Sequence, residues 1–373
     1  MNLINTKRDT LLKPLQIVSG IVDQKRTLPI LSNVLIRKEQ ERFFFVTTDL
    51  EIEIEAHSID SENSSKENFS ITVSAKKLLD ILRAFSADTT VILNKTDNRL
   101  QVNISKSRFN LQILPMEDFP RMAIEGKPEI SLTLPQKDLK NCLHRVQYAM
   151  AQQDIRYYLN GLLLLTGGQQ LKVVATDGHR LGFISTQFET ELIKKETILP
   201  RKTVHELVKL LEDSDKPVTV DFYPKKISFS FSDIILTSKI IDGKFPDFDR
   251  VIPKTNTRQF TIKRLDFLQA LQRAAILSNT ADKFRGVKLV ISDNRLSILC
   301  KNSEQEEAQE DLDIDYNSQE TIDISFNITY LLDVLNNLDS ETVQCSFENA
   351  NSGTLITIPD DETFKYVVMP MRL

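Results

Sequence analysis

"VSAKKLLDILRAF", residues 73–85, decides the fold because the chain contains two further copies of this stretch. It returns as "LPRKTVHELVKLL" from Leu199 and as "ISFNITYLLDVLNNL" from Ile324, so the copies begin 126 and then 125 residues apart. Each copy has the pattern of a strand end that continues into an amphipathic helix. This recurrence indicates a duplicated structural unit, and its period exceeds the roughly 20–50 residues of solenoid repeats.

The other elements recur in the same order around this stretch. A second helical pattern, with leucines three and four residues apart, reads "TKRDTLLKPLQIV" near residue 6, "PQKDLKNCLHRVQ" near 135 and "IKRLDFLQALQRAAIL" near 262. Strand patterns begin at residues 28, 156 and 283 with "LPILSNVLIR", "RYYLNGLLLLT" and "KFRGVKLVIS". Each unit thus combines two helices with many short strands, which predicts an α+β fold with the helices packed on antiparallel sheet.

Proline-bearing joins near residues 121–130 and 251–260 mark the boundaries between the units. We therefore predict three similar domains, residues 1–125, 130–254 and 257–373. A chain of 373 residues has room for two or three domains of ordinary size.

The composition is that of a folded globular protein, with 41% hydrophobic and 27% charged residues. No apolar run approaches the roughly 18 residues of a membrane-spanning helix, and the N-terminus is polar too early for a secretion signal. These features predict a cytoplasmic protein. Cys142, Cys300 and Cys345 lie far apart and outside any CxxC motif, so we expect buried thiols rather than disulfides or a zinc site.

The charge is distributed unevenly along the chain. The net charge is -5, yet the six recurring helical segments together carry +7, which leaves -12 for the remainder. Basic helices in an acidic chain indicate a polyanionic partner, although Lys and Arg are also common on ordinary helix surfaces. No base-reading motif accompanies them, which favours contact with phosphates without sequence readout.

The stretch "ATDGHRL", residues 175–181, is chemically rich in one copy only. Its counterpart in the first unit, "TTDLEIE", keeps Thr48 and Asp49 but has no Gly, His or Arg. Asp177-Gly178 between apolar strands predicts a hairpin turn. The chain has four histidines, none sharing a motif with another, and no phosphate loop, nucleophile elbow or HExxH motif. We therefore predict a protein that is not an enzyme, with no catalytic residue, metal or cofactor.

Opposite charges lie near the two ends of the chain. The acidic run "NSEQEEAQEDLDID" begins at Asn302, and the first unit contains the basic "SKSRF". These are the ends that would meet if chains joined head to tail, and two such joins would close a ring. The dimer-interface candidates, including the neighbouring apolar residues, are Lys106, Arg108, Phe109, Leu111, Ile276, Leu277, Glu304, Glu306 and Glu307.

Several of these stretches together resemble the bacterial sliding clamp family, the β subunit of DNA polymerase III. The signatures "LLKPLQIVSG", "TLPILSN", "AMAQQDIRYYLNG", "VATDGHRL", "TSKIIDGKFPDF", "RAAILSN", "KFRGVKL", "NSEQEEAQE" and the terminal "YVVMPMRL" follow the order of the family. The resemblance implies a homodimer in which two three-domain chains form a head-to-tail ring. Helices then line the hole through which duplex DNA passes, and the clamp serves as a processivity factor.

The resemblance also implies two sets of binding residues. Non-sequence-specific contacts to duplex DNA would involve Lys25 or Arg26, Lys76, Lys77, Arg83, Gln153, Arg156, Tyr157, Arg201 and Lys202. A pocket for short peptides of the polymerase III α subunit, the clamp loader and other clamp-binding proteins would comprise Leu159, Thr176, Gly178, His179, Arg180, Leu181, Pro246, Arg250, Val251, Phe284, Asn327, Tyr330, Val367, Val368, Met369, Pro370, Met371 and Arg372. The alternative is a repeat-built protein scaffold that never encircles DNA.

Overall fold

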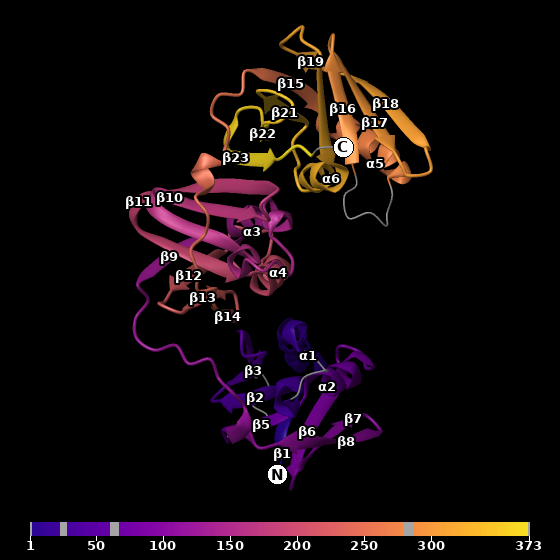
Figure 1. The fold of residues 1–373 in the computed structure, drawn as a ribbon. Coiled ribbons are helices and arrows are strands. Elements are labelled where there is room, and N and C mark those ends of the chain that lie inside the picture. Colours follow the sequence, from indigo (N-terminus) through magenta and orange to yellow (C-terminus); the bar gives the residue numbers. More distant parts are fainter. Residues whose placement is uncertain (1, 23–27, 60–66, 279–285, 372–373) are drawn as a thin grey trace. The chain divides into compact units, whose positions relative to one another are not determined.

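The computed structural model describes residues 2–22, 28–59, 67–278 and 286–371 (Figure 1). The chain folds into two compact units, Met1–Leu139 with His205–Ile240 and Lys140–Val204 with Ile241–Leu373. The helices are α1 (Arg8–Val18), α2 (Ala75–Arg83), α3 (Gln136–His144), α4 (Arg201–Leu210), α5 (Arg264–Ala274) and α6 (Ile328–Asn336). Among the described residues, each repeat thus contains two α-helices, as predicted, and the α+β class is confirmed.

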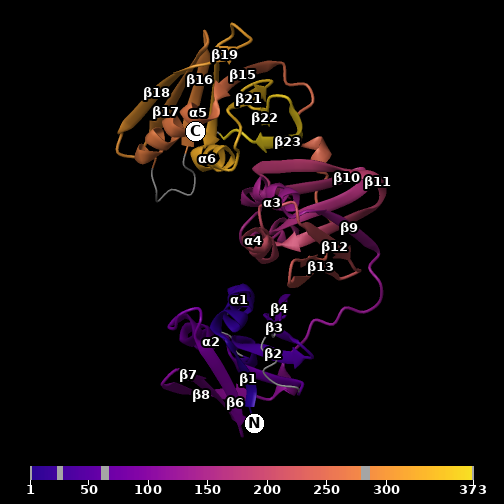
Figure 2. The ribbon, with the colours of Figure 1, turned by 180° about the vertical axis from the view of Figure 1, so that it is seen from behind.

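The first unit contains one twelve-stranded sheet with the order β1-β6-β7-β8-β5-β2-β3-β4-β14-β13-β12-β9. Its strands are β1 (Asn2–Lys7), β2 (Asn33–Glu39), β3 (Arg42–Thr48), β4 (Ile52–Ile59), β5 (Phe69–Ser74), β6 (Thr90–Thr96), β7 (Arg99–Ile104), β8 (Ser107–Leu114), β9 (Ile130–Pro135), β12 (Pro217–Phe222), β13 (Lys226–Phe231) and β14 (Ile234–Lys239). Figures 1 and 2 both show α1 and α2 side by side in this unit.

The second unit contains a seven-stranded sheet, β10-β11-β23-β22-β21-β15-β19, and a four-stranded sheet, β18-β17-β16-β20. The strands are β10 (Gly161–Thr176), β11 (Arg180–Pro200), β15 (Arg258–Lys263), β16 (Gly286–Ser292), β17 (Arg295–Lys301), β18 (Glu307–Asp313), β19 (Asp315–Tyr316), β20 (Ile322–Asn327), β21 (Thr342–Phe347), β22 (Thr354–Ile358) and β23 (Asp361–Val368). Helices α5 and α6 contact each other in this unit (Figure 2).

The helices are amphipathic, and their apolar faces form the core. On α2, Leu78 and Leu82 are completely buried, whereas Lys76 and Lys77 are exposed. Burial of each leucine contributes roughly 1.5–3 kcal/mol, which holds α2 on the sheet and leaves its basic face outward. Ser74 caps the start of the helix, and its hydroxyl accepts a hydrogen bond from the backbone N–H of Lys77.

Helix α1 tolerates an internal proline because another element supplies the missing hydrogen bond. Pro14 has no N–H, so the carbonyl of Thr10 has no intrahelical partner. The hydroxyl of Ser58, on β4, donates to that carbonyl at 2.7 Å. The sequence around Pro14 can therefore remain helical where α1 packs against the sheet.

The sheets run across the boundaries between repeats. Strand β4 of the first repeat pairs with β14 of the second, and β11 of the second pairs with β23 of the third, both antiparallel. Within the described residues, two strands at corresponding positions of the repeats have no such partner from another repeat. They are β18, at the edge of its sheet, and β8, whose residues Ser107–Gln112 pair only with β7. The compact units therefore cut through the second repeat, because its two halves extend the sheets of different neighbours.

Candidate functional site

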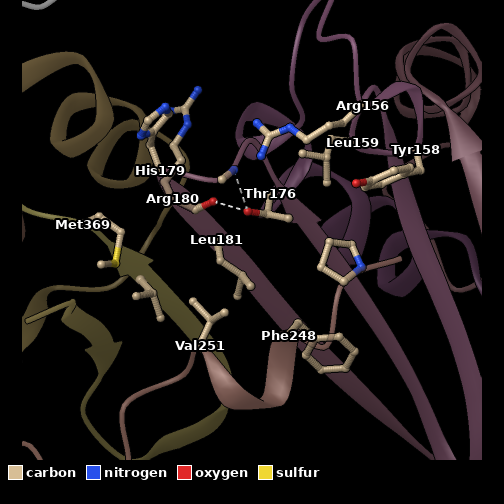
Figure 3. Close-up of a pocket in the computed structure, with 13 residues that line it drawn as sticks. Arg156, Tyr158, Leu159, Thr176, His179, Arg180, Leu181, Phe248, Val251 and Met369 are labelled. Carbon is tan, nitrogen blue, oxygen red and sulfur yellow. Dashed lines mark hydrogen bonds between the residues drawn. The ribbon is translucent and has the colours of Figure 1, made fainter. Parts of the chain in front are cut away.

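A cavity of about 180 Å³ lies wholly within the second unit (Figure 3). Its floor is apolar: Leu181, Phe248 and Val367 belong to one buried hydrophobic cluster. Val251 and Met369, at its rim, are 44% and 40% exposed. The lining residues are Arg156, Tyr158, Leu159, Thr176, Gly178, His179, Arg180, Leu181, Pro246, Phe248, Val251, Val367 and Met369.

One wall of the cavity is the hairpin loop between β10 and β11. The hairpin prediction is confirmed, but Thr176 pairs with Leu181, so the loop is longer than a two-residue turn. Thr176 Oγ1 donates to the carbonyl of Arg180 at 2.6 Å and accepts from the N–H of Gly178. Asp177 Oδ1 accepts from the N–H groups of His179 and Arg180. Side chains thus satisfy the loop backbone and fix its shape.

The first repeat builds the same loop with the same two residue types. Thr48 Oγ1 donates to the carbonyl of Ile52 and accepts from the N–H of Leu50. Asp49 Oδ1 accepts from the N–H groups of Glu51 and Ile52. Thr and Asp are therefore architectural in both repeats, and what distinguishes the second copy is the Gly178, His179 and Arg180 carried on that loop.

Arg180 joins the loop to two neighbouring segments, the one containing Tyr148 and helix α6. Its Nε donates to Asp177 Oδ2 at 3.0 Å, Nη1 to Asp333 Oδ2 at 2.5 Å and Nη2 to the carbonyl of Tyr148 at 2.6 Å. The guanidinium also lies over the ring of Tyr330, 4.4 Å from its centroid. Burial lowers the pKa of Arg180, but Tyr366 and the two carboxylates outweigh this effect, so its pKa lies above the ordinary value.

The end of β23 is tied to the same loop. The backbone N–H of Met369 donates to the carbonyl of exposed His179 at 2.9 Å. The N–H of Met371 donates to the carbonyl of Ser325 at 2.8 Å. The last described residues are therefore held by backbone hydrogen bonds, and the thioether of Met369 stays at the cavity rim (Figure 3).

Most of the predicted pocket residues line this cavity. Those that do not are Arg250, Asn327, Tyr330, Val368, Pro370 and Met371, and Phe284 and Arg372 lie outside the described residues. Val368 lies on the opposite face of β23 from Val367 because side chains alternate along a strand. The sequence did not single out Tyr158 or Phe248 for the pocket, and it assigned Arg156 to DNA.

The predicted DNA-contacting residues differ in exposure. Those exposed on α2 are Lys76, Lys77 and Arg83; Gln153, Arg156, Tyr157 and Lys202 are also exposed. Arg201 is half-buried, and its Nη1 donates to the carbonyl of Met150 at 3.0 Å, while burial lowers its pKa. Lys25 and Arg26 lie outside the described residues.

The predicted interface residues lie near the two open strand edges. Exposed Lys106 and Arg108 flank the start of β8, followed by half-buried Phe109 and buried Leu111. Exposed Glu304 and Glu306 precede β18, and Glu307 begins it. Ile276 is 77% exposed next to the partly buried Leu277, so an uncovered apolar side chain lies beyond the end of α5.

Residues 2–22, 28–59, 67–278 and 286–371 offer neither a metal site nor a membrane-spanning helix. No group of three His, Cys, Asp or Glu side chains there could hold a metal ion. None of the helices in that part of the chain is both long enough and apolar enough to span a membrane. The three cysteines are free and buried, as predicted.

Three family models match successive parts of the chain: the N-terminal domain of the DNA polymerase III beta subunit at residues 1–123, the central domain at 133–247 and the C-terminal domain at 249–372. The chain belongs to the DNA polymerase III beta-subunit family. The resemblance found in the sequence motifs is thereby confirmed.

Relatives match the chain from end to end. It is 40% identical to the beta sliding clamp of Vibrio cholerae and 41% identical to that of Escherichia coli K12, in each case over 98% of this chain and 99% of the relative. The crystal structure of a sliding clamp from Pseudomonas aeruginosa bound to griselimycin has a TM-score of 0.94 at 39% identity, with 99% of both chains covered. The Caulobacter crescentus pol III beta structure has a TM-score of 0.92 at 36% identity over 100% of both chains.

Proposed function

We propose that the chain is a processivity factor, in which two copies form a head-to-tail ring around duplex DNA and tether replication and repair proteins. The observation that carries this proposal is the match to three clamp domains in order, with relatives near 40% identity over almost their whole length. We assign the three domains to residues 1–125, 130–254 and 257–373.

The open sheet edges support a head-to-tail dimer. Twice within the chain, a strand that ends a run of hairpin-connected strands in one repeat pairs with a strand that ends such a run in the next repeat. These pairs are β4 with β14 and β11 with β23. The third such pair would be β18 of one copy with β8 of the other, and both edges are open in the described chain. Acidic Glu307 on β18 and basic Arg108 on β8 would favour this pairing over a like-with-like one.

The exposed basic residues of α2 support contact with DNA phosphates. Leu78 and Leu82 fix the inner face of α2, so Lys76 and Lys77 are held toward solvent. Such contacts are non-specific and salt-dependent, as a protein that slides on DNA requires. Helix α6 has no Lys or Arg and would contribute least to this grip.

The pocket supports peptide docking rather than catalysis. Its floor is apolar, and the polar groups of its hairpin loop are engaged in holding the loop and Arg180 in place. We infer that apolar and aromatic side chains of the polymerase III α subunit, the clamp loader and similar partners occupy it, with no cofactor and no reaction. Since the bacterial chromosome lies in the cytoplasm, we place the function there.

Primer extension on a singly primed circular single-stranded template tests this function. Polymerase III core, clamp loader and ATP are supplied with and without the purified chain. We expect full-length products only when the chain is present. Removal of residues 369–373 should abolish this effect, because Met369 lies at the rim of the pocket that both the polymerase and the clamp loader would use. Unchanged product length with the intact chain would contradict the proposal and favour a protein scaffold.

A further inference from the structure

The guanidinium of Arg156 is held in one position at the cavity wall. Its Nε donates to Asp154 Oδ1 at 3.0 Å and its Nη2 to Asp154 Oδ2 at 2.8 Å, a two-point contact between a planar cation and a carboxylate. Nη2 also donates to the carbonyl of Asp177 at 3.2 Å, on the hairpin loop. The Arg156 side chain therefore spans from its own segment to the opposite wall (Figure 3).

Asp154 is itself anchored. Its N–H donates to Asn160 Oδ1 at 2.9 Å, and its carbonyl accepts from Asn160 Nδ2 at 2.9 Å. Asp154 Oδ1 also accepts from the backbone N–H of Arg156 at 2.8 Å. The hydrogen bonds from Arg156 lower the pKa of Asp154 to about 2, so the carboxylate is charged at any physiological pH.

Gly178 leaves the space that this arginine occupies. A Cβ at Gly178 would lie 3.0 Å from Arg156 Nη1 and 3.1 Å from Nη2, closer than side chains ordinarily approach. Gly178 has φ +89°, but this conformation alone does not require glycine, because Leu50 has φ 75° in the equivalent loop of the first repeat. In the second repeat the guanidinium also lies against this position, so a methyl group there would displace it by a few tenths of an ångström.

From this geometry we propose that Asp154 is a positioning residue that holds Arg156 flat on Gly178 as a fixed cationic wall of the pocket. No described residue accepts a hydrogen bond from Nη1, whose two N–H groups remain for a ligand. The occupant would therefore offer an oxygen, a peptide carbonyl or a carboxylate, beside the apolar side chain that enters the floor. This inference rests on the proposed peptide-docking function.

Two variants displace Arg156 in different ways. Asp154→Asn keeps the acceptor Oδ1 but replaces the oxygen facing Nη2 with an amide that also donates, so the two groups repel. Gly178→Ala adds a methyl group where the guanidinium lies and leaves every charge unchanged. Gly168→Ala is the matched control, since Gly168 also has positive φ (+58°) but has nothing within 4 Å of the added Cβ.

Fluorescence anisotropy with a labelled peptide from the clamp-binding segment of the polymerase III α subunit measures the effect. We expect Asp154→Asn and Gly178→Ala each to weaken binding about tenfold, typical of losing one hydrogen bond to a charged group, and Gly168→Ala to bind normally. In an Arg156→Gln background, Asp154→Asn should cause no further loss, because its effect passes through Arg156.

Three results would overturn the inference. Wild-type affinity in both Asp154→Asn and Gly178→Ala would show that the position of Arg156 does not matter to the peptide. An equal further loss in the Arg156→Gln background would mean that Asp154 acts independently. Lost retention on DNA with unchanged peptide affinity would assign Arg156 to DNA instead. If the wild-type chain fails to bind the peptide at all, the proposed docking function itself is contradicted.

Discussion

Replacing Arg180 by methionine tests whether the second and third repeats are held together at the pocket by one side chain. Methionine keeps the length and apolar packing of the stem but removes the three hydrogen bonds to Asp177, Asp333 and the Tyr148 carbonyl. The Arg180 side chain is only 10% exposed, whereas that of Asp333 is 32% exposed and regains some water. A hydrogen bond to a charged group contributes about 1.5–3 kcal/mol. Because Asp333 is partly rehydrated in the variant, we expect the three lost bonds together to destabilise this contact by about 3 kcal/mol.

Hydrogen–deuterium exchange followed by mass spectrometry measures this loss of stability segment by segment. A decrease of about 3 kcal/mol in the free energy of opening accelerates exchange roughly a hundredfold in amides that open by this route. We expect that acceleration in α6, which carries Asp333, and in the first residues of β11, which carry Arg180. Lys288→Met is the control, because its ion pair with Asp323 is exposed and contributes little. If Arg180→Met accelerated exchange no more than Lys288→Met, the joining role of Arg180 would be refuted.

Three further predictions concern other parts of the chain. Glu307→Lys and Arg108→Glu should each shift the sedimentation coefficient at micromolar concentration from that of a dimer to that of a monomer. The control Glu191→Lys, at an exposed position on β11, should remain dimeric. Equal behaviour of all three variants would contradict the proposed interface. Since the pKa of Asp154 is depressed to about 2, its contribution is complete above pH 4 and is lost only as the pH falls through 2. The ratio of wild-type to Asp154→Asn peptide affinity should therefore be constant from pH 8 to 5, and a ratio that collapsed in that range would be inconsistent with a charged Asp154. Burial raises the pKa of Cys345 to about 12, so iodoacetamide at pH 8 should label it only after denaturation; labelling of the native chain would count against its burial.

The fold class could be read from the sequence because its signal is local and repeated. Leucine spacing places Leu78 and Leu82 on one helix face, which leaves Lys76 and Lys77 on the other. Three copies of that pattern made the assignment of two helices per repeat independent of any single segment. Pairing between repeats was not predictable in this way, because the register of β4 with β14 depends on strands far apart in the sequence.

The pocket was predicted from the family resemblance, and the misses have physical reasons. Phe248 contributes to the floor through the hydrophobic cluster that it shares with Val367, a contact that spacing along the chain does not encode. The role of Gly178 depends on Arg156, twenty-two residues earlier, and a glycine in a turn ordinarily suggests only its backbone conformation. The family resemblance assigned Arg156 to DNA, and only the folded chain brings its guanidinium to the hairpin loop at the cavity wall.

Topological linkage to DNA is the central claim, and retention on circular DNA tests it most directly. The chain is loaded onto nicked circular plasmid with a bacterial clamp loader and ATP, separated from free protein by gel filtration, and the plasmid is then linearised. We predict that the chain remains with the circle through gel filtration at moderate salt and is released once the circle is cut. Equal retention on circular and linear DNA, or none on either despite an active loader, would contradict encirclement.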